Sequence, residues 1–204
     1  MGGLLCGFGS AAIFWSNPMT LLIVGIVTFF AIHLVPSLPP LRSTAVQRLG
    51  ENTYKMIYTA LAAAGLILII WGKATADYIH LWTPPDWGQT IAFPLVLAAL
   101  ILLAASHMPG NITRLVRHPM LWGVTLWALA HLLANGDLAS LLLFGSFLLY
   151  SLFDIVSATV RKTGKIPEPH PVFRDLITVA AGAVVFAVLV FLHPYLFGPQ
   201  LNYF

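Results

Sequence analysis

Charge is what this sequence has least of. Only 8% of its 204 residues are Asp, Glu, Lys or Arg, whereas 59% are hydrophobic. A soluble domain typically has about 25% charged residues and would not hide this much apolar surface. The sequence therefore predicts an integral membrane protein that is embedded in a lipid bilayer.

Cysteine and recognisable catalytic motifs are also scarce. Cys6 is the only cysteine, which excludes an internal disulfide and a thiolate metal cluster. The chain has no HExxH, Walker-type loop or GxSxG turn. Its carboxylates are too few for a paired acid/base site in the bilayer core, and Asp154 is costly there unless it is paired, protonated or near the interface. Chemistry would have to come from a bound cofactor or small molecule.

Long apolar windows dominate the rest of the sequence. Six of them can cross a hydrocarbon core of about 30 Å as helices: 18–38, 54–73, 89–106, 118–135, 138–160 and 175–197. We expect an all-α integral membrane bundle with a single transmembrane domain over 18–204 and an N-terminal extension over 1–17. That extension lacks the basic start of a signal peptide.

Basic residues cluster in alternate connections between these windows. The first, third and fifth connections contain Arg42, Arg48, Lys55, Arg114, Arg117, Arg161, Lys162, Lys165 and Arg174. The second has only Lys73, and the fourth has none. The positive-inside rule then places the odd-numbered connections in the cytoplasm and both termini outside it. This sorting accounts for the net charge of +3, so we expect no nucleic-acid partner.

Two local patterns predict details of helix packing and helix ends. Small residues at Ala60, Ala63 and Ala64 should let another helix approach closely. In the segment ANGD, Gly136 is expected to take a left-handed conformation at a helix end, and Asp137 to cap the next helix.

Of the seven histidines, His33 and His131 lie well inside predicted spans, whereas His118 and His193 lie near the ends of theirs. An unpaired polar group in hydrocarbon costs several kcal/mol, so such residues are functional candidates. Two functions are open to them. They can simply pack, each bonded to a carbonyl or serine, or they can serve as the two axial ligands that a b-type haem requires. Trp127 and Asn135 share the helix face of His131, which suits a porphyrin wall and equally suits helix packing.

The residues alone do not fix which histidines would pair. His118 and His131 are thirteen residues apart on one helix, or about 20 Å along its axis, and cannot serve one haem together. The depths of the side chains permit His33 with His131, His33 with His118, or His131 with His193.

Four stretches resemble the NnrU family of bacterial membrane proteins: AIHLVPSLPPLR, RLGENTYKMIYTALAAAGLILIIWG, LWTPPDW and RHPMLWGVTLWALAHLLANGDLASLLLFGSFLLYSLFD. The last stretch is the most specific, and the resemblance runs from residue 20 to the end. It implies a multi-pass protein of the bacterial inner membrane, linked to denitrification through the expression or function of nitrite and nitric oxide reductases. The family is in turn similar to the 15-cis-zeta-carotene isomerase of carotenoid synthesis.

The likeness to the isomerase implies a haem b, with iron held by two histidines and a redox-linked ligand change that opens a position for a polyene. Carried over to this sequence, the ligands would be His33 and His131, with His118 as the other member of the thirteen-spaced pair. A hydrophobic small molecule would then be the substrate of a haem-dependent cis–trans isomerisation.

Two alternatives stand beside this interpretation. RHPMLWG, residues 117–123, is similar to the RHPxYxG element of membrane methyltransferases that use S-adenosylmethionine. The tyrosine of that element is missing here, and no acidic EExxL-type element follows in RKTGKIPEPHP, so expected contacts to adenosylmethionine are absent. The third hypothesis is a non-catalytic accessory subunit of a membrane protein complex, in which the histidines only pack.

Overall fold

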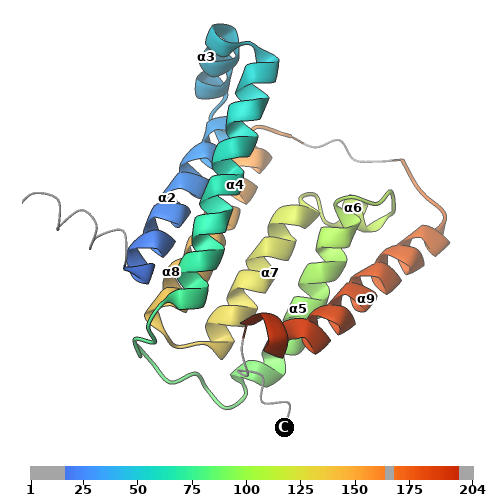
Figure 1. The fold of residues 1–204 in the computed structure, drawn as a ribbon. Helices are drawn as coiled ribbons and strands as arrows, with labels where there is room; N and C mark the ends of the chain where they lie inside the picture. The colour runs from blue at the N-terminus through green and yellow to red at the C-terminus, as the bar shows by residue number, and fades with distance from the viewer. Residues whose placement is uncertain (1–16, 164–167, 198–204) are drawn as a thin grey trace, which may run out of the picture. The chain divides into compact units, whose positions relative to one another are not determined.

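The computed structural model of the chain describes residues 17–163 and 168–197, and these residues form helices and no strand (Figure 1). The all-α prediction is therefore confirmed for that part of the chain. Residues 1–16 of the predicted extension, with Cys6, lie outside the described residues, as does Lys165.

Five helices are long and apolar enough to cross a membrane. They are α2 (Pro18–Ser37), α4 (Glu51–Thr75), α5 (Gly88–Ala105), α8 (Leu138–Val160) and α9 (Val172–Phe197). The remaining predicted window forms α7 (Pro119–Ala134), an apolar helix of 16 residues. At 1.5 Å per residue α7 is about 24 Å long, short of the hydrocarbon core. Six spans thus remain a prediction, as does the placement of the termini.

The chain forms two compact units, unit 1 (Met1–Ile79) and unit 2 (His80–Phe204). Unit 1 contains α2, α4 and the short α3 (Pro39–Leu49) between them. Unit 2 contains α5, α7, α8, α9 and the single turn α6 (Ile112–Leu115).

Glycines let α2 and α4 of unit 1 lie side by side (Figure 1). A Cβ added at Gly25 would lie 2.7 Å from the backbone nitrogen of Ile69, and one at Gly65 would lie 2.8 Å from that of Phe29. Gly72 faces the backbone of Leu22 in the same way. The two backbones are therefore in van der Waals contact. In a membrane, this attraction is one of the main forces that hold helices together.

The prediction that alanines form the packing face of α4 was wrong. Ala60, Ala63 and Ala64 are exposed in the chain, and Gly65 beside them is buried. An alanine still has a Cβ, whereas the observed spacing leaves no room for one at Gly65.

Prolines end α2 and begin α3. Pro36 lies in the last turn of α2, Leu38 is extended, and Pro39 occupies the first turn of α3, where no N–H is needed. The predicted end of the first helix is confirmed, but the restart as α3 was not anticipated. No residue of α3 is buried.

In unit 2, α5 packs on α7 and α9, and α7 packs on α8 (Figure 1). Gly123 of α7 brings that helix against the carbonyl oxygen of Ala99, which a Cβ would approach to 2.9 Å. Between α7 and α8 the hydroxyls of Thr125 and Ser151 are hydrogen-bonded at 2.8 Å and buried. Unit 2 thus combines close backbone contacts with polar side-chain contacts.

The connection between α7 and α8 is tied to the connection that precedes α5. Asp137 accepts a hydrogen bond from the backbone N–H of Ser140 at 2.9 Å, so the predicted cap is confirmed. Gly136 is not left-handed, contrary to prediction. Its carbonyl accepts from the N–H groups of Leu81 (2.8 Å) and Trp82 (3.1 Å), and a Cβ would collide with the Trp82 oxygen.

Candidate functional site

His33 lies on α2, one turn before the end of the helix. Its Nδ1 is 2.6 Å from the carbonyl oxygen of Phe29, four residues earlier. A carbonyl can only accept, so Nδ1 carries the proton and donates. In the neutral ring, Nε2 is then the nitrogen with the lone pair, which is the atom that would bind a metal.

Aromatic rings surround the imidazole of His33. The ring of Phe29 stacks on it, with centroids 4.0 Å apart and planes at 26°. Tyr58 of α4 approaches in a tilted arrangement at 5.4 Å. Since Gly65 packs on the backbone of Phe29, the close approach of α4 also fixes the carbonyl that holds His33.

His131 on α7 makes the same type of hydrogen bond as His33. Its Nδ1 donates to the carbonyl oxygen of Trp127, again four residues earlier, at 2.7 Å. The same argument leaves the lone pair on Nε2. Both intramembrane histidines are half-buried, and both have an aromatic residue one turn before them.

The rings around His131 form a cluster that spans two helices. Phe144 of α8 stacks on the imidazole with centroids 4.5 Å apart and planes at 23°. Trp127 lies 5.1 Å away and makes edge contacts with Phe144 at 5.0 Å and with Phe147 at 5.5 Å. Trp127 therefore lies beside His131 as expected from the helix face, whereas Phe144 and Phe147 were not anticipated.

Asn135 lies at the end of α7 and acts on the backbone. Its Nδ2 donates to the carbonyl oxygen of His131 at 2.8 Å. The amide thereby closes the last turn of the helix. Its predicted contact with a cofactor remains a prediction.

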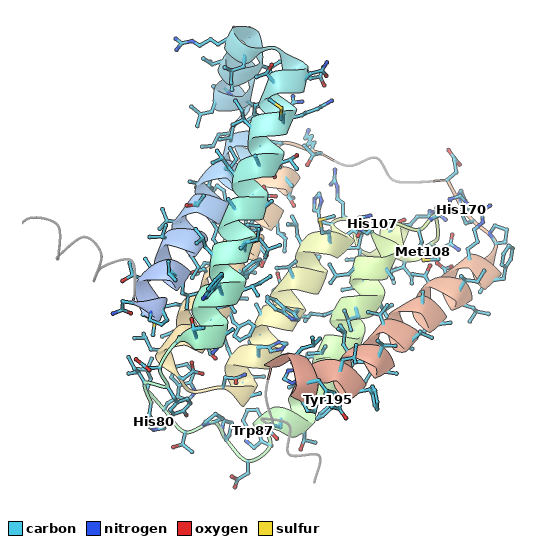
Figure 2. The ribbon with its side chains drawn as sticks, in the orientation of Figure 1. His80, Trp87, His107, Met108, His170 and Tyr195 are labelled. Carbon is cyan, nitrogen blue, oxygen red and sulfur yellow. The ribbon has the colours of Figure 1, made fainter. Side chains whose placement is uncertain are left out.

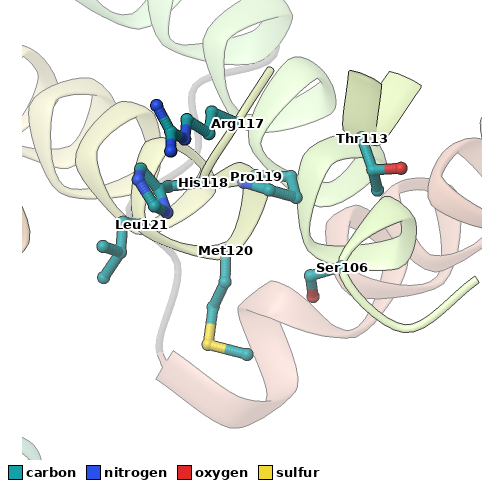
Figure 3. A pocket seen from close by; sticks show the side chains of 7 residues that line it. All are labelled: Ser106, Thr113, Arg117, His118, Pro119, Met120 and Leu121. Carbon is teal, nitrogen blue, oxygen red and sulfur yellow. The ribbon is translucent and has the colours of Figure 1, made fainter. Parts of the chain in front are cut away.

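His118 occupies the residue before α7 and caps the helix with no side-chain hydrogen bond. Its Nε2 is buried and has no hydrogen-bond partner among the residues that the structure describes. It lines a pocket of about 290 Å³. Figure 3 shows the lining side chains: Ser106, Thr113, Arg117, His118, Pro119, Met120 and Leu121. Ligand sites are typically about 300–1,000 Å³, so this pocket suits a small group. His118 and His131 lie near opposite ends of α7, as the spacing requires.

The other histidines lie at the ends of unit 2. Figure 2 shows His107 and His170 at one end, and His80 at the other. His193 lies on α9, in the same unit as His131, and its pairing with His131 remains a prediction.

Hydrogen bonds between Asp175 and Asn111, together called the clasp, join the two basic connections of unit 2. The sequence did not predict them. Asp175 of α9 accepts from the backbone N–H groups of Asn111 (2.6 Å) and Ile112 (3.1 Å) and from the Asn111 side chain (2.7 Å). The Asn111 side chain also bonds the backbone of His170 in both directions. The third and fifth connections thus meet at one end of unit 2, and the cytoplasmic placement of this end stays a prediction.

Asp154 lies in the second half of α8 and is paired. Its Oδ1 is 3.1 Å from the Nη2 of Arg161, seven residues later, and both side chains are mostly buried. An intramembrane carboxylate needs such a partner. Asp154 is therefore explained by its ion pair.

The donor chemistry of His33 and His131 fits an iron porphyrin. Metal-bound histidines commonly donate their other ring N–H to a carbonyl, which orients the ring and fixes the tautomer. Both imidazoles do so. Among the described residues no three His, Cys, Asp or Glu side chains come together, but haem ligation needs only two imidazoles.

The family model described as NnrU protein matches residues 21–201. No curated protein and no solved structure matches the chain.

Proposed function

The chain belongs to the NnrU family, and from this premise we propose that it binds one haem b through Nε2 of His33 and Nε2 of His131. One observation carries the proposal. Each of these imidazoles, on a different apolar helix, donates its Nδ1–H to the carbonyl four residues earlier and so presents Nε2 as a ligand. A histidine that only packs would make the same bond to a carbonyl, so the absorption spectrum below is needed to separate the two functions.

The side chains around the two ligands would orient them and exclude water. Phe29 and Phe144 stack on the imidazoles and restrict their rotation. Trp127 provides an apolar wall beside His131. The haem itself would supply one-electron chemistry and an exchangeable coordination position.

We place this haem protein in the bacterial inner membrane, with six spans and both termini outside the cytoplasm. Its role would be in nitrogen-oxide metabolism, supporting the expression or function of nitrite or nitric oxide reductase, or in the cis–trans isomerisation of a hydrophobic polyene. Family membership supports the first role. The apolar and aromatic surroundings of both imidazoles support the second.

The test is the absorption spectrum of the purified protein after expression with added haem precursor. A Soret band that shifts on reduction with dithionite is expected. His33→Ala and His131→Ala should each change its position or intensity.

His80→Ala is the matched control, because His80 is exposed in a connecting segment of unit 2. It should leave the spectrum unchanged. A colourless wild-type protein would contradict the proposal, and so would unchanged spectra in both single variants at the intramembrane positions.

The RHPMLWG element beside the pocket at His118 gives a second candidate, a methyltransferase that uses S-adenosylmethionine, of which the pocket itself could hold only a part. Arg117 and the hydroxyl residues Ser106 and Thr113 line this pocket with polar groups, beside the RHPMLWG element. Equilibrium dialysis with labelled S-adenosylmethionine should then show saturable binding that His118→Ala removes. No binding to the wild-type protein would reject this candidate.

A further inference from the structure

The pocket at the start of α7 takes no part in the haem ligation proposed above. It lies within unit 2 and is lined by residues at the end of α5, in the turn α6 and in the first turn of α7. Its volume of about 290 Å³ is at the lower limit of ligand sites and suits a small polar group. The hydrogen-bonding groups around it indicate which chemistry fits.

Backbone N–H groups in the first turn of α7 lack acceptors inside the helix. Pro119 has no N–H, and the side chain of His118 caps none of the others. The N–H of Trp122 bonds the carbonyl of His118 at 3.1 Å. The N–H groups of Met120 and Leu121, two residues that line the pocket, are therefore the ones left over. Such groups lie at the positive end of the helix dipole and favour an anion.

Two side chains of the pocket point to an anion independently of the helix end. Nε2 of His118 is buried and has no hydrogen-bond partner among the described residues, which costs free energy unless a ligand supplies the partner. Arg117 makes no ion pair and no hydrogen bond within the described part of the chain. Its guanidinium is therefore available for a phosphate, which it can bind through two parallel N–H···O bonds.

The hydroxyl groups of the pocket can only accept further hydrogen bonds. Ser106 and Thr113 each donate their single hydroxyl proton to the carbonyl three residues earlier, at 2.6 and 2.9 Å. Figure 3 shows both of them on the other side of Pro119 from Arg117. A ligand that satisfies both sides of the pocket therefore carries an anionic group and, beside it, a hydrogen-bond donor.

Exposed apolar side chains near the pocket indicate that this ligand belongs to a lipid. Leu115 of α6 is 90% exposed, and Met120 and Trp122 are 46% and 40% exposed. Apolar residues and tryptophan beside arginines are typical of the membrane–water interface, where basic pockets between helices bind anionic headgroups.

We propose that this pocket binds the headgroup of an anionic phospholipid whose phosphodiester carries a hydroxylated alcohol, of which phosphatidylglycerol is the simplest. The basic side chains and the first-turn N–H groups hold the phosphate, and the hydroxyl oxygens of Ser106 and Thr113 accept from the alcohol. The inference goes beyond the proposed function, because the site uses neither His33 nor His131 and needs no haem.

Native mass spectrometry of the delipidated full-length protein tests the phosphate contact by titration with phosphatidylglycerol and phosphatidylcholine. The wild type should bind phosphatidylglycerol more tightly. Arg117→Gln should weaken this binding roughly tenfold or more, because a charge-assisted contact is lost. Arg48→Gln is the matched control, since it removes an exposed arginine from α3, and it should leave the affinity unchanged. Equal weakening in both variants, or no preference in the wild type, would overturn the proposal.

Phosphatidylmethanol tests the alcohol contact, because it has the charge of phosphatidylglycerol but no free hydroxyl. The wild type should prefer phosphatidylglycerol roughly 2–10-fold, the size expected for hydrogen bonds between neutral groups. Ser106→Ala and Thr113→Val should reduce this preference and leave the binding of phosphatidylmethanol unchanged. Thr159→Val is the control, since its hydroxyl also bonds a carbonyl of its own helix but is exposed on α8. A preference that survives both pocket variants would overturn the assignment of the alcohol.

Competition distinguishes a lipid headgroup from other ligands of the same pocket. An excess of inorganic phosphate or of S-adenosylmethionine should not displace phosphatidylglycerol. Displacement by either would overturn the proposal and assign the pocket to a soluble ligand. A colourless protein that still binds phosphatidylglycerol through Arg117 would refute only the proposed function, and a haem-loaded protein without this lipid preference would refute only the inference.

Discussion

Unit 1 and unit 2 each hold one candidate ligand, His33 or His131, whose Nδ1 bonds the carbonyl four residues earlier, yet the two units are packed by different means. In unit 1 the two long helices touch through their backbones at Gly25, Gly65 and Gly72. In unit 2 ring clusters, a buried hydroxyl pair and a carboxylate clasp add side-chain contacts between helices. The orientation of each imidazole is thus set within its own helix, whereas the packing around it depends on contacts between helices.

The packing of unit 1 predicts the largest mutational effect. Gly65→Leu would force side-chain atoms into the backbone of Phe29, which lies 2.8 Å from where the Cβ would begin. Overpacking costs about 1–3 kcal/mol and more where backbone must move. Thermal unfolding in detergent, followed by size-exclusion chromatography, should show a strongly lowered melting temperature.

Ala64→Leu is the matched control, since this neighbouring residue is exposed on the same helix. Its melting temperature should stay close to that of the wild type. If both leucine variants unfold alike, the close glycine contact does not hold the two helices together.

The clasp of unit 2 predicts the next effect. Asp175→Ala leaves the N–H groups of Asn111 and Ile112 without their acceptor, so the connection before α7 should open more often. Hydrogen exchange measured by mass spectrometry should become faster in the peptide that covers these two amides.

Glu168→Ala removes an exposed carboxylate from the connection before α9, which the clasp joins to the connection before α7. Exchange in that peptide should remain unchanged in this control. Equally fast exchange in both variants would mean that general charge, and not the clasp, protects the segment.

The buried hydroxyl pair predicts a smaller effect. A double-mutant cycle of Thr125→Val and Ser151→Ala should give a coupling free energy of about 0.6–1.7 kcal/mol, the range found for hydrogen bonds between membrane helices. Unfolding by denaturant in mixed micelles measures it. A coupling near zero would remove this contact from the features that distinguish unit 2.

The smallest effect is expected at the start of α4. Lys55 and Glu51 form an exposed ion pair at 2.8 Å, four residues apart. Exposed ion pairs contribute little to the free energy of unfolding, because water screens their charges. Lys55→Gln should leave the melting temperature unchanged, and a clear drop would show that unit 1 depends on more than its glycine contacts.

Features encoded within one stretch of chain were predictable. The apolar windows at 18–38 and 138–160 match α2 and α8 to within one residue, because a run of apolar residues between prolines or polar caps specifies a helix in a membrane. Asp137 could be identified as a cap from its position alone. His33 and His131 stood out because imidazoles are rare in such runs.

Features that depend on distant partners were not predictable. Phe144 stacks on His131 from another helix, and Asp175 binds Asn111 across 64 residues of sequence. A single sequence holds no signal for either pairing. Likewise, nothing in the run of small residues before Gly65 indicated that the contact needs the complete absence of a Cβ.

Electron paramagnetic resonance of the oxidised, haem-supplied protein is the most direct test of ligation by His33 and His131. The wild type should give a low-spin ferric signal with couplings to two histidine nitrogens after labelling with ¹⁵N-histidine. Each single alanine variant should lose one coupling or convert to high spin. Absence of any haem signal, or an unaltered low-spin signal in both variants, would contradict ligation by these two residues.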